Sequence, residues 1–261
     1  MKINEKDKLK YLTFDSFEKT KLVRHAFSTR CGGVSEGYFS ELNLGFNRGE
    51  DREKVISNYK LFCNAVSISY ENIVFSNQVH GTAIKHVKKG DFCEDIDALI
   101  TNKPSVVLTT IYADCVPIYF LDTEKKVIAL AHAGWRGTVS EIATLTLEEM
   151  RSVYDCQTEN ILVGIGPSIS KCCFEVDTPV YEAFKKLDFA EDYISKQPNN
   201  NKFYIDLQAI NKQMLINAGL LSKNIELANI CTKCNPDLFY SHRLMGAKRG
   251  TMIAVMELVE N

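Results

Sequence analysis

The sequence lacks any long apolar run and any excess of charge of one sign. Its 261 residues carry a formal net charge of −2, which excludes the strongly basic composition typical of proteins that bind along a nucleic-acid backbone. No apolar stretch comes close to the roughly 18 residues of a membrane-spanning helix, and the charged start MKINEKDKLK has no signal-peptide pattern. We therefore expect no nucleic-acid partner, no membrane partner and a cytoplasmic location.

Histidine is scarce, and the cysteines do not form an even set. The chain has five histidines and nine cysteines, and the cysteines are spread along its whole length. An odd, scattered set suits reduced thiols better than a disulfide framework. The hydrophobic share of 45% is sufficient for a sizeable core, so we expect one domain over residues 1–261.

Segments rich in β-branched and aromatic residues alternate with helical patterns. The predicted strands are Val23–Thr29, Ile73–His80, Val106–Ala113, Pro117–Asp122, Val127–His132, Ile161–Ile165, Ile225–Ile230 and Thr251–Glu257. The predicted helices are Asp51–Val66, Thr138–Tyr154, Pro179–Leu187 and Leu207–Ala218, the last closed by Gly219. This order predicts an α/β or α+β fold with a mixed sheet. The run Gln197–Asn201 predicts an exposed loop.

Three short motifs place a metal-binding side chain beside residues that constrain the backbone. They are NQVHG at residues 77–81, ADCVP at 113–117 and AHAGWRG at 131–137. Imidazole nitrogen and thiolate sulfur suit Zn²⁺, and three protein ligands leave a fourth tetrahedral position open, as in catalytic zinc sites. His80, Cys115 and His132 are therefore the candidate metal ligands and catalytic residues.

The same three residues also have purely structural interpretations. Cys115 follows an apolar strand, where cysteine often acts as a small buried hydrophobe. His132 suits a hydrogen-bonded core histidine equally well. The intervals between the three residues match neither a zinc finger nor an HExxH helix, so the residues alone leave both interpretations open.

Six motifs, taken in order, give the chain a resemblance to a known family. It resembles the YfiH family, also labelled multicopper polyphenol oxidase or laccase-like. The motifs that carry the resemblance are NQVHG, DALIT (97–101), ADCVP, AHAGWRG, GPSISKCCFEV (166–176) and FYSHR (239–243). In that family the metal is carried by the histidine of QVHG, the cysteine of ADC and the histidine of HAGWRG. The resemblance therefore implies a metal on His80, Cys115 and His132.

The resemblance also implies a fold and an activity. It implies a single α/β domain related to the catalytic domain of the cytotoxic necrotizing factors. It further implies a zinc-dependent enzyme that cleaves adenosine, inosine, guanosine and S-methyl-5'-thioadenosine with phosphate and deaminates adenosine to inosine. The laccase label implies Cu²⁺ and polyphenol oxidation instead, but five histidines do not supply the clusters that several coppers require. We expect a monomer or a weak homodimer.

Several neighbours of the ligand motifs are candidates for supporting roles. Arg136 lies at the start of a predicted helix, where charge and helix dipole favour phosphate, although a surface arginine beside a tight turn is an equal interpretation. The zinc deaminases that use an H-x-E glutamate have no counterpart here, so Asp114, Asp97 and His242 are the candidates for proton transfer. The other candidate substrate-binding residues are Asn43, Arg48, Gln78 and, in a second role, His242.

Three further patterns are given structural interpretations. The glycines of Gly164–Pro167 begin a dinucleotide-loop pattern, but Ile169 replaces its third glycine. Cys231 and Cys234 have C-x-x-C spacing with no second pair of ligands near them in sequence, which predicts a structural or incidental pair. The adjacent cysteines 172 and 173 are predicted to pack against the sheet.

Two other functions remain open at this stage. The relationship to the necrotizing factors would make Cys115 and His132 a metal-free nucleophile pair that acts on amides, with His80 unexplained. A link of bacterial relatives to the editing of peptidoglycan precursors would instead make the chain a partner or quality-control factor.

Overall fold

The structure, a computed structural model, describes residues 1–197 and 201–260. Residues 198–200 of the predicted loop lie outside this part. The strands are β1 Lys2–Lys6, β2 Leu9–Thr13, β3 Val23–Ser28, β4 Ile73–Ser76, β5 Ile84–His86, β6 Phe92–Cys93, β7 Ala98–Thr101, β8 Val107–Tyr112, β9 Val116–Asp122, β10 Val127–Ala133, β11 Ile161–Ile165, β12 Glu175–Asp177, β13 Ile194–Lys196, β14 Lys202–Ile205, β15 Ile225–Leu227 and β16 Met252–Leu258. The α-helices are α1 Asp15–Thr20, α2 Arg52–Val66, α3 Trp135–Val139, α4 Ile142–Tyr154, α5 Thr178–Phe184, α6 Leu207–Asn217 and α7 His242–Met245. Short 3₁₀ turns lie at Gly37–Phe39, Phe46–Arg48, Tyr70–Asn72, Thr158–Asn160, Ala190–Tyr193 and Ser222–Asn224.

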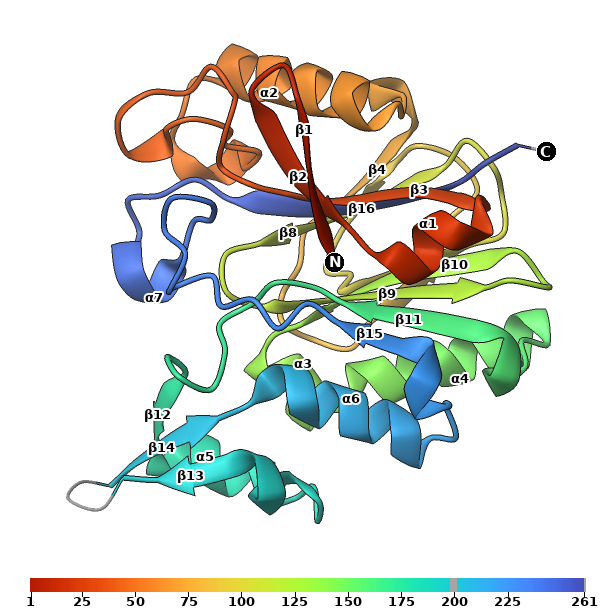
Figure 1. Cartoon of the computed structure of the whole chain (residues 1–261), viewed down its shortest axis with the longest axis vertical. Helices are drawn as coiled ribbons and strands as arrows, with labels where there is room; N and C mark the ends of the chain where they lie inside the picture. Colours follow the sequence, from red (N-terminus) through yellow and green to blue (C-terminus); the bar gives the residue numbers. More distant parts are fainter. Residues whose placement is uncertain (198–200, 261) are drawn as a thin grey trace.

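Two mixed sheets pack face to face, with helices on both outer faces (Figure 1). One sheet has the order β1-β2-β3-β16-β8-β4-β6 and the other β15-β11-β9-β10-β7-β5. Helix α2 covers the first sheet, and α3, α4 and α6 cover the second. A small third sheet, β12-β14-β13, projects with α5 at one end. The fold is thus a four-layer α/β/β/α arrangement.

The central strands are buried on both faces, and β16 shows the consequence in sequence. Successive side chains of a strand point to opposite faces. Met252 and Ala254 face the core between the sheets, whereas Ile253 and Val255 pack against the α2 side. A strand with two buried faces reads as a continuous apolar run rather than an alternating one. This explains why the runs that form β8, β9, β10 and β16 could be recognised in the sequence.

The predicted mixed α/β class is confirmed, and most predicted elements are present. The strand Ile161–Ile165 has the predicted bounds, and Gly219 follows α6 with a left-handed φ of +97°. Three predictions were wrong in detail. The strand from Ile73 ends at Ser76, so His80 is not in it, and the strand from Ile225 ends at Leu227. The predicted helix 138–154 is two helices, because the backbone turns left-handed at Glu141, where φ is +59°.

None of the helices in residues 1–197 and 201–260 combines the length and apolarity that a membrane crossing requires.

His25 is a buried histidine that makes the stability depend on pH. Its Nε2 accepts a hydrogen bond from the Phe14 amide at 2.7 Å, and burial lowers the pKa of its ring to about 4, against a weaker opposing effect of Glu226. An unfolded chain binds the proton near pH 6.5. The contribution of neutral His25 to the free energy of unfolding should therefore be complete above pH 6.5. It should fall by about 3 kcal/mol as the pH drops to 4.

Chemical denaturation of the wild type and a His25→Gln variant between pH 7 and pH 4 measures this contribution. Glutamine keeps an acceptor but does not titrate, so the variant should lose less stability over the same interval. Parallel pH profiles for the two proteins would contradict the assignment.

Candidate metal centre

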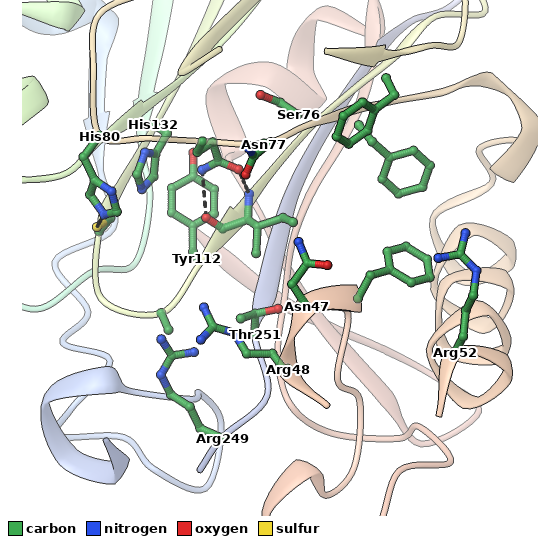
Figure 2. Close-up of a pocket in the computed structure, with 18 of the residues that line it drawn as sticks. Asn47, Arg48, Arg52, Ser76, Asn77, His80, Tyr112, His132, Arg249 and Thr251 are labelled. Atoms are coloured by element: carbon green, nitrogen blue, oxygen red, sulfur yellow. Dashed lines mark hydrogen bonds between the residues drawn. The ribbon is translucent and has the colours of Figure 1, made fainter. Parts of the chain in front are cut away.

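The three predicted ligands meet where the chain passes between the two large sheets. His80 follows β4, Cys115 lies between β8 and β9, and His132 is in β10. Their candidate ligand atoms all lie within 4.8 Å of one another, and Cys115 Sγ is 3.7 Å from His80 Nε2. Figure 2 shows the rings of His80 and His132 next to each other at one end of a cavity. The spatial convergence agrees with the sequence prediction of a shared site.

Unusual backbone geometry brings these side chains together. His80 has a φ of +62° and Asp114 a φ of +93°, values that L-residues adopt rarely and at some energetic cost. A Cβ on Gly134 would lie 2.6 Å from His80 Cδ2 and 3.3 Å from Cys115 Sγ. Any larger residue at position 134 would therefore displace a ligand.

The buried carboxylate of Asp97 orients both histidines. Its Oδ1 accepts from His132 Nδ1 at 2.8 Å and from the His80 amide at 3.0 Å, and its Oδ2 accepts from the amides of Val79 and Gly81. Burial acts to raise the pKa of Asp97, but the hydrogen bonds from His132 and the amides outweigh burial and lower it. Because Nδ1 of His132 is engaged, its Nε2 is the nitrogen free for a metal, the usual carboxylate–histidine–metal arrangement.

Cys115 and His132 form an electrostatically coupled pair. Burial opposes ionisation of the thiol, yet His132 and His80 lower the pKa of Cys115 to about 6. Burial also acts to lower the pKa of His132, but Cys115 and Asp97 raise it to about 9. The sulfur is therefore held as a thiolate, which is the form that binds metals and attacks electrophiles.

The donor set fits a single ion better than a multicopper centre. Two imidazoles and one thiolate with an open position suit Zn²⁺. Blue-copper sites use the same donors with a weak axial methionine, but no methionine of the described residues lines the cavity. The remaining histidines, His25, His86 and His242, bond to other groups away from this site.

The cavity beside the ligands has a volume of about 530 Å³, within the range of small-molecule sites. Its aromatic wall consists of Phe46, Tyr70, Phe75 and Phe92. The guanidinium of Arg52 stacks 4.8 Å from the Phe46 ring centroid, at the end of the cavity away from His80 and His132 (Figure 2). Such a wall can stack a flat heteroaromatic ring.

Two arginines give the cavity a cationic flank. Arg48 and Arg249 extend toward each other below the histidines (Figure 2), although like charges repel. Arg249 is 5% exposed, and its Nε has no hydrogen-bond partner among the described residues. Burial, followed by the charge of Arg48, lowers the pKa of Arg249 to about 10. Neither arginine makes an ion pair within the described residues, although Arg249 Nη1 donates to the Gly250 carbonyl at 3.0 Å. Two such cations facing a cavity suit an anionic ligand.

The structure brings only some of the predicted substrate residues to the cavity. Arg48 lines it, and Gln78 lines it while its amide is hydrogen-bonded to both backbone groups of Ile111. Asn43 lies behind it, where its Oδ1 accepts from the amides of Gly45 and Thr251 and so supports the loop that carries Arg48.

Three other predicted residues do not line the cavity. Arg136 stacks on Trp135, with Cζ 4.3 Å from the ring centroid. His242 is exposed in α7 and bonds to the Gly246 carbonyl. Asp114 has both carboxylate oxygens engaged, by Thr232 and by Ser241 and the Arg243 amide. No aspartate or glutamate of the described residues lines the cavity.

Sequence reasoning missed two sets of residues. Arg249 and the aromatic wall carry no motif, because only the folded chain buries Arg249 and brings those rings to one cavity. The spatial partners of the C-x-x-C pair are the second set. Cys234 Sγ lies 3.6 Å from Cys172 Sγ and 3.4 Å from Cys173 Sγ, so the pair does have partners in space.

Taken together, the fold and the site define a class: four-layer α/β/β/α proteins with two histidines and one cysteine gathered between two sheets as a candidate metal site. Within that class, residues 24–259 match the family described as multi-copper polyphenol oxidoreductase laccase, and the chain belongs to this family.

Named relatives and solved structures agree with this assignment. The chain is 35% identical over 260 residues to a purine nucleoside phosphorylase of Bacteroides thetaiotaomicron, with 95% of this chain and 96% of the relative covered. It is 33% identical over 246 residues to adenosine deaminase RL5 of an unknown prokaryotic organism, with 90% and 94% covered. The crystal structure of Bacillus licheniformis hypothetical protein YfiH superposes with a TM-score of 0.91 at 28% identity, covering 98% of this chain and 99% of that one. Geobacillus stearothermophilus YlmD superposes with a TM-score of 0.88 at 29% identity, covering 98% of both chains.

Proposed function

We propose that this protein is a zinc-dependent purine nucleoside phosphorylase that acts on adenosine, inosine, guanosine and S-methyl-5'-thioadenosine. The observation that carries the proposal is the pair Arg48 and Arg249, which faces the ligands His80, Cys115 and His132 across a cavity with an aromatic wall. The relatives named purine nucleoside phosphorylase support the choice of substrate. We also propose that the protein is cytoplasmic and is a monomer or a weak homodimer.

In this proposal the two arginines bind inorganic phosphate. A phosphate oxygen attacks C1' of the ribose while the bond from C1' to the purine nitrogen breaks. The purine leaves as an anion and takes a proton from water, and ribose 1-phosphate remains. Phosphate arrives already ionised, so this reaction needs no general base, which agrees with a cavity that no carboxylate of the described residues lines.

The other groups orient the reactants. The aromatic wall stacks the purine, and Asn47, which lines the cavity (Figure 2), offers its side-chain amide to the nucleoside. Asp97 fixes the ring of His132 so that the ligand set is complete before substrate binds. His80, Cys115 and His132 would hold zinc, which would supply Lewis-acid chemistry at this end of the cavity.

Adenosine deamination is a second candidate, supported by the relative named adenosine deaminase RL5. It requires the amino end of the base to point toward His80 and His132, whereas the arrangement above places the base at the aromatic wall. The two reactions therefore need two orientations of the nucleoside. Of the three predicted proton carriers, Asp97 and Asp114 have their oxygens occupied, and His242 does not line the cavity. Phosphorolysis is therefore the better supported of the two.

A metal-free thiol enzyme is a third candidate, since Cys115, His132 and Asp97 also form a nucleophile–base–carboxylate series. Polyphenol oxidation rests on the family description alone, because the described residues hold no cluster of histidines for several coppers. An editing role on peptidoglycan precursors rests on the resemblance alone.

An assay with defined metal content tests the proposal. Protein reconstituted with Zn²⁺, incubated with adenosine and phosphate, should give adenine and ribose 1-phosphate in equal amounts, and chelation should abolish both. Omission of phosphate should stop adenine release while any inosine formation continues. Adenine formed without phosphate, or no adenine from zinc-loaded protein, would show that the enzyme is not a phosphorylase.

A further inference from the structure

A second cluster of thiols lies away from the proposed active site. Cys172 and Cys173 precede β12, and Cys231 and Cys234 follow β15, yet the four Sγ atoms lie within 4.8 Å of one another. None of the four residues lines the cavity described above, so this quartet is a separate feature.

The spacing of the sulfur atoms matches the coordination shell of one tetrahedral ion. Three of the pairs are 3.7, 3.6 and 3.4 Å apart. With a Zn–S distance of about 2.3 Å, the edge of a regular tetrahedron of thiolates is about 3.8 Å. A disulfide brings two sulfurs to about 2.05 Å, and all four residues are free cysteines. An iron–sulfur cluster spreads its thiolates over several irons and so separates them further.

The backbone around the quartet is arranged like the surroundings of a metal–thiolate site. The Ser170 amide donates to Cys231 Sγ at 3.5 Å, a contact that stabilises a thiolate. Ser168 and Cys231 form an isolated parallel β-bridge, and the Gln208 amide bonds to the Ser168 hydroxyl at 2.9 Å. The Asn235 amide donates to the Cys231 carbonyl and closes the C-x-x-C turn. The two segments are thus held in register independently of the sulfurs.

Exposure of the sulfur-bearing residues also suits entry of an ion. Cys172 and Cys234 are exposed, Cys173 is half-buried and Cys231 is buried. An ion can therefore reach the quartet from solvent and be enclosed on the protein side. Four protein ligands leave no open position, which is the pattern of structural rather than catalytic zinc.

We propose that Cys172, Cys173, Cys231 and Cys234 bind one structural Zn²⁺. Binding forms four Zn–S bonds and releases the thiol protons to solvent, with no change of oxidation state. The ion joins the segment that leads into the small β12-β14-β13 sheet to the segment that leaves β15.

The quartet is also connected to the proposed active site. Thr232, inside the C-x-x-C turn, donates to Asp114 Oδ1 at 2.6 Å, and Asp114 directly precedes Cys115. The amide of Ile169, just before the other cysteine pair, donates to the Asp114 carbonyl at 2.8 Å. The structural zinc is therefore expected to steady the turn that positions Cys115.

Zinc stoichiometry separates the two sites. Purified wild-type protein should contain two zinc ions per chain, and the His80→Ala/His132→Ala double variant, which leaves the quartet intact, should retain one. A Cys172→Ser/Cys234→Ser variant should also retain one. Cys31→Ser is the matched control, since Cys31 is a half-exposed free cysteine outside the quartet, and it should retain both ions.

Cobalt substitution identifies the ligands without relying on activity. Co²⁺ bound to the His80→Ala/His132→Ala variant should show the intense thiolate-to-cobalt absorption of a four-sulfur tetrahedral site, and Cys172→Ser/Cys234→Ser should lose it. Chelation of zinc from the double histidine variant should lower its Tm by about 10 °C. The proposal would be overturned if the double histidine variant bound neither zinc nor cobalt. It would also be overturned if mass spectrometry found the quartet joined in disulfides after anaerobic reduction and addition of zinc.

Discussion

Replacement of His80 by alanine is expected to lower phosphorolysis by about 10³-fold. A Lewis acid contributes several kcal/mol to such a reaction, and each 1.4 kcal/mol corresponds to about a factor of ten. His80 is the informative ligand to remove because Cys115, His132 and Asp97 remain in place. Steady-state rates should be measured with the zinc content of the same samples, so that lost metal and lost activity can be compared directly.

The same variant decides between metal catalysis and a thiol nucleophile. If Cys115 attacks the substrate with His132 as its base, the His80→Ala variant should keep most of its activity while Cys115→Ala loses it. If the three residues hold zinc, both variants should be inactive. His86→Ala is the matched control, since His86 is a partly exposed histidine bonded to Tyr154 and Glu149, and it should be as active as the wild type.

Replacement of Arg249 by methionine is expected to lower kcat/KM for phosphate by about 10²-fold, the usual cost of removing one preorganised donor from an anion site. Methionine has a similar length but no charge, so packing is largely kept. The stability should not fall, because the variant removes a buried charge whose Nε lacks a partner among the described residues and relieves the repulsion with Arg48. Initial rates at varied phosphate, together with Tm, measure both effects.

Two further arginine variants show whether the effect is specific. Arg151→Met is the matched control, since Arg151 is an exposed residue of α4, and it should leave kcat/KM unchanged. Arg136→Met tests the competing prediction from sequence. A larger loss for Arg136→Met than for Arg249→Met would place phosphate at the start of α3 and contradict the assignment to Arg48 and Arg249.

The sequence was informative about the fold where a strand is buried on both faces. The apolar runs that become β9, β10 and β16 were recognisable because both faces of these strands are buried and carry mostly apolar residues. The strands β1, β5 and β6 were missed because they are short or polar and are defined by pairing with a neighbour rather than by their own pattern. Periodicity could not reveal that the strand from Ile73 ends at Ser76 or that a left-handed φ at Glu141 divides a predicted helix.

The three candidate ligands could be named from the sequence, whereas most of the residues around them could not. His80, Cys115 and His132 lie in motifs with adjoining glycine or proline, and the structure shows why Gly134 is needed. Arg249 becomes a candidate only when tertiary packing buries it beside Arg48. The cysteine quartet joins segments about sixty residues apart in sequence, and a search for ligand pairs close in sequence could not detect it.

The position of His80 and Cys115 on the passages between the two large sheets has a consequence for folding. Each sheet can form its own hydrogen bonds alone, but the ligands converge only after the sheets have docked. Contacts between residues far apart in sequence form late, because the entropy of closing long loops must first be overcome. We therefore expect the chain to acquire the active-site metal as one of its last folding steps, so that metal affinity reports how tightly the two sheets are joined.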